Sequence, residues 1–159
     1  MKENGHHKKV LKMRLIVELF LALAMIMAFC LPEKAFCGSP KEREAKAVLQ
    51  AARKFLDAEV RRDYPAVYAC LAPSSPYTQT HNYQQYLAQA KVSPDRIIAY
   101  RIVRISYIQN PDDRKTYPTV DRVAQVEVDV TFLQEGTQRR SVVNIGFIFL
   151  KEGGKWYKS

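Results

Sequence analysis

The chain has 159 residues, a formal net charge of +9 and three cysteines. A chain of this length forms one domain with a sizeable hydrophobic core, which excludes a large multidomain enzyme. Its basic residues are scattered, and no basic block alternates with aromatic residues, so the charge does not indicate a nucleic-acid-binding protein.

The N-terminal segment has the order of a secretory signal peptide. A basic stretch precedes an apolar run at residues 19–31, and small residues follow at Ala35 and Cys37, the positions that a signal peptidase inspects. We predict cleavage after Cys37. Residues 1–37 are then a signal peptide, and residues 38–159 form one mature domain that is periplasmic or secreted.

Two other fates of this segment stay open. A single N-terminal membrane anchor is one, because the apolar segment extends back to Leu15, but its 17 residues include Glu18 and fall short of the ~20 that span a bilayer comfortably. Lipid anchoring at Cys30 or Cys37 is the other, although phenylalanine stands before each cysteine where a small residue is expected. A membrane is thus a partner only through an uncleaved leader.

Cleavage simplifies the composition of the remaining chain. It removes six of the 25 basic and three of the 16 acidic residues, which leaves 122 residues with a net charge of +6. This surplus favours solubility, with an anionic membrane surface or envelope polymer as the alternative partner. Cys70 becomes the single cysteine, so no intramolecular disulfide forms, and its apolar helical surroundings favour a buried thiol.

Three helices are expected first in the mature domain. Residues 39–42, Ser-Pro-Lys-Glu, have the form of a capping box that starts a long helix. Asp63 is expected to cap a short second helix that residues 73–76 close, and Thr80 a third that runs to about Lys91. The apolar stripe of the long helix has three- and four-residue spacing: Ala45, Val48, Leu49, Ala52, Phe55, Leu56 and Val60.

Four strands are expected after the helices. Residues 97–108 are rich in β-branched and aromatic residues but alternate imperfectly, which indicates a bulge or burial on both faces. The next two strands alternate strictly, and a turn near Gly136, expected to supply a positive φ, joins them. Residues 153–154, Gly-Gly, then lead into a closing strand at residues 156–157. The apolar faces of the two alternating strands are Val126, Val128, Val130 and Phe132, and Val143, Ile145, Phe147 and Phe149.

The predicted fold class is therefore α+β, with three N-terminal helices packed on a strongly curved antiparallel sheet. Each element presents a single apolar face, so we expect one core. Its predicted members are Val48, Leu49, Phe55 and Leu56 from the long helix, and Val128, Val130, Ile145 and Phe147 from the strands.

The order of these signals resembles the nuclear transport factor 2-like superfamily, which has a cystatin-like cone fold. Phe-Leu at residues 55–56, Arg-Asp-Tyr at 62–64, Leu71 before Ser-Ser and a final Gly-Lys-Trp-Tyr carry the likeness. The pattern Asp-Tyr-x-x-x-Tyr-x-x-Leu at residues 63–71 is similar to the non-catalytic N-terminal domain of penicillin-resistant transpeptidases. The resemblance implies a cone whose mouth often holds a ligand pocket. It also implies no single chemistry, because the superfamily includes isomerases, dehydratases, cyclases, transport factors and accessory domains.

No residue pattern identifies a catalytic residue, a cofactor or a metal. His81, the sole histidine after cleavage, lies in a polar stretch that favours a surface role, and Asp129 alternates outward with Glu127 and Thr131. One histidine and one cysteine do not make a dense metal site, and neither a glycine-rich phosphate loop nor Ser-His-Asp spacing is visible.

Aromatic side chains are the remaining candidates, because they can line an apolar pocket as well as fill a core. The predicted function is an exported, stand-alone, non-catalytic module of the cell envelope that binds another protein or a small apolar ligand. A small-molecule enzyme of the isomerase, dehydratase or cyclase type is the alternative, and the sheet offers a surface for a homodimer. The candidates for lining a ligand pocket are Tyr68, Tyr86, Tyr100, Tyr107, Phe147 and Trp156.

Overall fold

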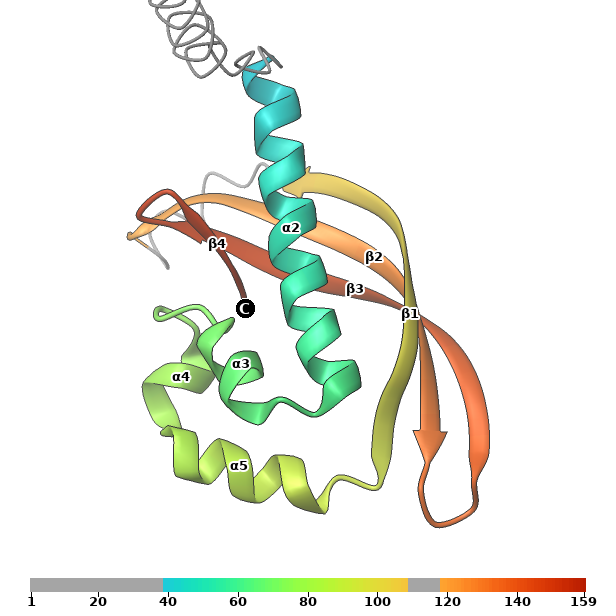
Figure 1. The fold of residues 1–159 in the computed structure, drawn as a ribbon. Helices are drawn as coiled ribbons and strands as arrows, with labels where there is room; N and C mark the ends of the chain where they lie inside the picture. The colour runs from blue at the N-terminus through green and yellow to red at the C-terminus, as the bar shows by residue number, and fades with distance from the viewer. Residues whose placement is uncertain (1–38, 109–117) are drawn as a thin grey trace, which may run out of the picture. The chain divides into compact units, whose positions relative to one another are not determined.

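The computed structural model describes residues 39–108 and 118–159, and the predicted leader lies outside them (Figure 1). The described chain has the expected α+β class, with helices before an antiparallel sheet. None of its helices is long and apolar enough to cross a membrane. The elements are α2 (Pro40–Arg61), α3 (Tyr64–Ala69), α4 (Pro76–Thr80), α5 (Tyr83–Val92), β1 (Asp95–Ile108), β2 (Val120–Gln134), β3 (Arg139–Glu152) and β4 (Lys155–Lys158).

The predicted starts of the first two helices are confirmed. The Glu42 amide donates to Ser39 Oγ at 3.2 Å and the Ser39 amide to Glu42 Oε2 at 2.7 Å, which completes the capping box. α2 ends where Arg62 adopts a left-handed conformation with φ 56°. The carboxylate of Asp63 then accepts the Ala66 amide at 3.2 Å and caps α3.

The predicted boundaries of the later helices are wrong in two places. Residues 73–76, expected only to close the second helix, instead start α4, because Ser75 is an N-cap and Pro76 occupies the first helical position. Thr80 does not cap the following helix: its hydroxyl donates back to the Pro76 carbonyl at 2.7 Å, and Asn82 caps α5. The described chain therefore has four helices where the sequence predicted three.

The sheet has the order β1-β2-β3-β4 with every pair antiparallel. β1 carries irregularities at Ile97/Ala99 and at Ile102/Arg104, which confirms the predicted bulge and explains the mixed alternation, since each extra residue moves the inward phase by one. Figure 1 shows β1 bending along its length. The inward residues of β1 are Ile97, Tyr100, Ile102, Ile105 and Tyr107.

Glycine was expected to supply the positive φ in both hairpin turns, and it does so in only one of them. Gly153 and Gly154 have φ of 54° and 80°, so the second turn uses glycine as expected. In the first turn the positive φ belongs to Gln138, at 55°, and not to Gly136. The Gln138 side chain donates to the Glu135 carbonyl at 2.7 Å and braces this turn.

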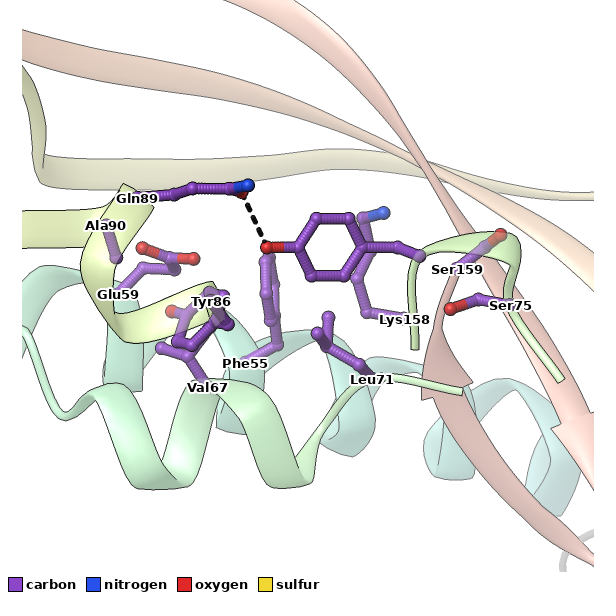
Figure 2. Close-up of a pocket in the computed structure, with 11 residues that line it drawn as sticks. Phe55, Glu59, Val67, Leu71, Ser75, Tyr86, Gln89, Ala90, Lys158 and Ser159 are labelled. Carbon is purple, nitrogen blue, oxygen red and sulfur yellow. Dashed lines mark hydrogen bonds between the residues drawn. The ribbon is translucent and has the colours of Figure 1, made fainter. Parts of the chain in front are cut away.

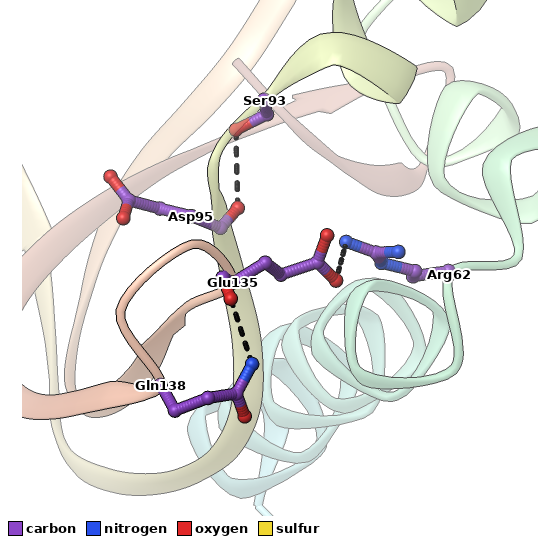
Figure 3. A network of polar contacts seen from close by, with 5 residues as sticks. All are labelled: Arg62, Ser93, Asp95, Glu135 and Gln138. Carbon is purple, nitrogen blue, oxygen red and sulfur yellow. Dashed lines mark hydrogen bonds and ion pairs between the residues drawn. The ribbon is translucent and has the colours of Figure 1, made fainter.

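Polar contacts attach the β2–β3 turn to the start of β1 and the end of α2 (Figure 3). The Arg62 guanidinium lies 2.6 Å from the Glu135 carboxylate. The Glu135 amide donates to the Pro94 carbonyl at 3.0 Å, and Ser93 Oγ donates to the Asp95 carbonyl at 3.1 Å. The end of α2 is thus held beside the end of the sheet by exposed groups.

One large hydrophobic cluster joins α2 to the sheet, as predicted, and the partly buried Ile145 and Phe147 pack against it. Leu49 is an exception: it lies outside this cluster because it faces the edge of the helical stripe, about a quarter turn round from Val48. Val143 shares the apolar face of β3 but is 45% exposed near the β2–β3 turn. The buried centre consists of Val48, Ala52, Phe55, Leu56, Ala58, Val67, Cys70, Ala124, Val126, Val128, Val130, Phe149 and Trp156.

Phe55→Ala should lower the free energy of unfolding by about 3–5 kcal/mol, because it empties a buried site between α2 and the sheet. Urea denaturation measures the change. Leu49→Ala, one to two turns earlier on the same helix, is the control and should cost less than about 1 kcal/mol. Equal losses for the two variants would show that α2 is not packed on the sheet through Phe55.

Candidate functional site

A pocket of about 440 Å³ lies between the second half of α2, the helices α3 to α5 and the end of β4 (Figure 2). Its volume is within the range of small-molecule sites. Its wall is largely apolar, with a few polar groups. The lining residues are Phe55, Glu59, Val67, Leu71, Ser75, Tyr77, Tyr86, Gln89, Ala90, Lys158 and Ser159.

Glu59 brings a carboxylate into this pocket from the core-facing side of α2. It follows Phe55 by four residues and Val48 by eleven, about three helical turns, so it lies near the centre of the apolar stripe. Burial raises the pKa of the Glu59 carboxyl, and the positive charge of Lys158 offsets part of that rise. The ionised form of Glu59 is therefore less stable here than in water.

Lys158 reaches the pocket from β4. Strand alternation places it on the same face as the buried Trp156, two residues earlier. Its backbone is fixed on both sides: its amide donates to the Cys70 carbonyl at 2.8 Å, and its carbonyl accepts from the Ala72 amide at 2.7 Å. Burial lowers the pKa of the Lys158 ammonium, and the charge of Glu59 offsets part of that fall.

The two charges do not satisfy each other directly. The Glu59 carboxylate and the Lys158 ammonium are too far apart to form an ion pair. No hydrogen bond joins either side chain to another described residue. Glu44 makes the comparison clear, because it lies on the same side of α2 and is also partly buried. Both of its carboxylate oxygens accept from Lys151 Nζ at 2.9 Å. Glu44 is therefore a paired structural charge, whereas Glu59 faces a cavity.

Aromatic side chains from α4 and α5 close one side of the pocket. Tyr77 donates its hydroxyl to Gln89 Oε1 at 2.8 Å, the contact that the dashed line in Figure 2 marks. The Tyr77 ring packs edge-on to Tyr86, with ring centroids 6.4 Å apart, and stacks on His81 at 4.4 Å. Burial, and next the Glu59 charge, raise the pKa of the Tyr86 hydroxyl, so this group stays protonated and available as a hydrogen-bond donor.

The aromatic residues that the sequence nominated fall into two groups. Tyr86 lines the pocket, and Tyr68 packs behind it with ring centroids 5.5 Å apart while donating to the His81 carbonyl. The other four do not line this pocket. Their contacts are Tyr100 Oη to Asp57 Oδ1 at 2.7 Å, Tyr107 beside Trp156 at 6.4 Å, and Phe147 edge-on to Phe55 at 5.8 Å.

The other polar candidates lie away from the pocket lining. Asp129 points outward, as predicted, and hydrogen bonds from Asn144 and then Arg101 lower the pKa of its carboxyl. His81 is partly exposed, and its Nδ1 lies 2.9 Å from the Thr80 hydroxyl. Cys70 is buried, as predicted, and its thiol is free. Within residues 39–108 and 118–159, no group of three or more His, Cys, Asp or Glu side chains could hold a metal ion.

Glu59 and Lys158 were not nominated from the sequence, although a signal for both was present. Each is a charged residue at a position that the periodicity of its own element assigns to the core. Such a position conflicts with burial unless the charge has a partner or a function. The meeting of the two residues could not be inferred, because they are separated by nearly a hundred positions in the chain.

Glu59→Gln should raise the free energy of unfolding near neutral pH. The folded state has the higher carboxyl pKa, so it binds more protons than the unfolded state, and stability falls as pH rises from the ordinary value of 4.5 through the raised one. Glutamine removes that loss. The stability gained by the variant should therefore grow from acid to neutral pH, as urea denaturation at several pH values will measure.

Glu44→Gln is the matched control for this prediction, since it changes the same residue type on the same side of α2. It breaks a paired, mostly buried contact with Lys151 and should cost about 1–3 kcal/mol at neutral pH. A Glu59→Gln variant that loses as much stability as Glu44→Gln would mean that Glu59 has a structural partner.

Comparison with known proteins does not assign the chain to a family. No model of a protein family matches the chain, and no curated protein matches it. The arrangement of the pocket is therefore the basis for a functional proposal.

Proposed function

We propose that this chain is an exported, non-catalytic module of the cell envelope that binds a small, largely apolar ligand in the pocket between α2, α5 and β4. The observation that carries the proposal is that Glu59 and Lys158 line one largely apolar pocket without forming an ion pair. Both residues are partly buried, and charges that burial disfavours are concentrated at binding and catalytic sites.

The proposal includes the cone fold of the nuclear transport factor 2-like superfamily. Two features support it. The bulges of β1 bend that strand, and a pocket lies between the helices and the end of β4, while the resemblance implies a ligand pocket at the mouth of a cone. We include in this proposal that the chain belongs to that superfamily and that it is most similar to the non-catalytic N-terminal domain of penicillin-resistant transpeptidases.

A protein partner is the other form of the binding hypothesis, and a homodimer through the sheet is its simplest case. Val103 on β1 and Val142 on β3 are exposed, which supports such a surface, whereas Val143 belongs to the opposite face of β3. These residues support binding less strongly than the pocket does, because isolated exposed aliphatic side chains are common on soluble domains.

An enzyme of the isomerase, dehydratase or cyclase type is the second candidate function. The raised pKa of Glu59 supports it, because a carboxyl that keeps its proton to a higher pH than in water can act as a general acid or base. Tyr86 lines the same pocket and could donate a hydrogen bond to a substrate oxygen. Glu59 is the group on which such catalysis would depend.

Capture of small molecules tests the proposal. The purified protein is incubated with an envelope extract, and the bound molecules are identified by mass spectrometry. We expect Ala90→Phe, which fills the pocket from α5, to abolish capture. Ala88→Phe places the same side chain on the exposed side of α5 and should leave capture unchanged.

Three results would contradict the proposal in different ways. A product formed from an extract molecule by the wild type but not by Glu59→Gln would favour the enzyme. Retention of a protein by both α5 variants, with no small molecule, would favour a surface partner. Equal capture by Ala90→Phe and Ala88→Phe would place the ligand outside the pocket.

Export is tested separately. Mass spectrometry of the protein isolated from the cell envelope or medium should find Gly38 as its first residue, because the signal peptidase would cut after Cys37. A chain that keeps Met1, or that carries a lipid on Cys30 or Cys37, would replace the soluble module by a membrane-attached one.

A further inference from the structure

We propose that Glu59 and Lys158 together hold the head group of the ligand, and that this head group is uncharged and both donates and accepts hydrogen bonds, with a carboxamide as the simplest case. The inference rests on the proposed ligand-binding function of the pocket and specifies its ligand. Figure 2 shows both side chains among the residues that surround the same cavity.

The two charged side chains line the pocket with hydrogen-bonding groups that no other described residue occupies. A carboxylate only accepts hydrogen bonds and an ammonium only donates them. The two form no ion pair, and no hydrogen bond joins either side chain to another described residue. A group that bridges them must therefore donate to Glu59 and accept from Lys158. The N–H and C=O of one amide do both.

The net charge of the site also favours an uncharged head group. Glu59 and Lys158 sum to zero, so an anionic head group gains from Lys158 but is repelled by Glu59, and a cationic one meets the reverse. A zwitterion could satisfy both charges, but it would have to bring two further charges out of water into an apolar pocket. An uncharged donor and acceptor gains both contacts with the smallest desolvation cost.

The apolar part of the pocket indicates the kind of tail that the ligand carries. Phe55, Tyr77 and Tyr86 contribute aromatic rings, and Val67 and Leu71 contribute aliphatic side chains. Tyr86 packs edge-on to Tyr77, so the rings form a corner and not a single flat surface. An aromatic or short aliphatic tail of a few carbon atoms suits a volume of about 440 Å³.

Four probes with one tail and different head groups test the inference: 3-phenylpropanamide, 3-phenylpropanoate, 3-phenylpropylamine and phenylalanine. Their affinities for the purified protein are measured by NMR titration near neutral pH. We expect the amide to bind most tightly, with each of the other three weaker by about tenfold, since a hydrogen bond to a charged group has roughly that effect on a binding constant.

Two substitutions should change the ranking in opposite directions. Glu59→Gln leaves the Lys158 charge alone and should make the propanoate the tightest probe. Lys158→Met leaves the Glu59 charge alone and should make the amine the tightest. Glu44→Gln changes a glutamate outside the pocket and should keep the amide first. Urea denaturation shows which variants are folded, and either pocket variant suffices to test the reversal.

The outcomes separate the inference from the proposed function. Equal affinities for all four probes, or an unchanged ranking in a folded pocket variant, would overturn the assignment of the head group while leaving the pocket as a ligand site. Phenylalanine as the tightest probe would replace the uncharged head group by a zwitterion. Failure of every probe to bind would overturn both the inference and the small-ligand function.

Discussion

Phe55 lies at the centre of the contact between α2 and the sheet, with its ring edge-on to Phe147 at 5.8 Å and to Phe149 at 6.4 Å. The valines of β2 complete the same cluster. This contact fixes the rotation of α2 about its axis, because a helix with one apolar stripe buries it in only one orientation. The direction of every other side chain on α2 depends on that orientation.

The orientation of α2 carries two glutamates inward, and their surroundings determine what each does. Glu44 meets Lys151 from β3 and forms a contact with both oxygens. Glu59 lies beyond Phe55, where α2 is faced by α3, α5 and the end of β4, and there a cavity takes the place of close packing. The same helical face thus gives one ion pair and one charge that faces a cavity.

Local signals in the sequence predicted the local structure well. Ser39, Asp63 and the Gly-Gly turn acted as expected, because a cap or a tight turn depends on a few neighbouring residues. Ambiguous signals gave the errors. Ser75 and Pro76 suit either a helix end or a helix start, and Thr80 and Asn82 are both acceptable caps. In the structure Ser75 accepts from the Thr78 amide at 3.3 Å and Asn82 accepts from the Gln85 amide at 3.0 Å, and residue type alone did not favour these caps over the alternatives.

The candidate site was less predictable than the fold, and for a different reason. Residue type favoured aromatic, histidine and cysteine side chains as candidates, whereas charged residues on α2 are usually part of a solvated face. The helical period places Glu59 on the core-facing side of α2, whereas its residue type predicts a solvated position. At this position the period predicted the side correctly and the residue type did not. Lys158 does the same in β4. Neither residue alone identifies a site, because each could have found a partner as Glu44 did.

Burial of Glu59 and Lys158 affects the free energy of unfolding of the domain. A leucine in place of Glu59 would extend the apolar stripe of α2 by another turn, and it would remove a carboxyl whose pKa burial has raised. Glutamate at this position therefore makes folding less favourable without a compensating contact inside the described chain. Lys158 has the same character, because burial lowers the pKa of its ammonium. Two opposite charges that are each partly buried, and that face one cavity without forming an ion pair, mark the end of α2 as a place where packing alone does not account for the residues present.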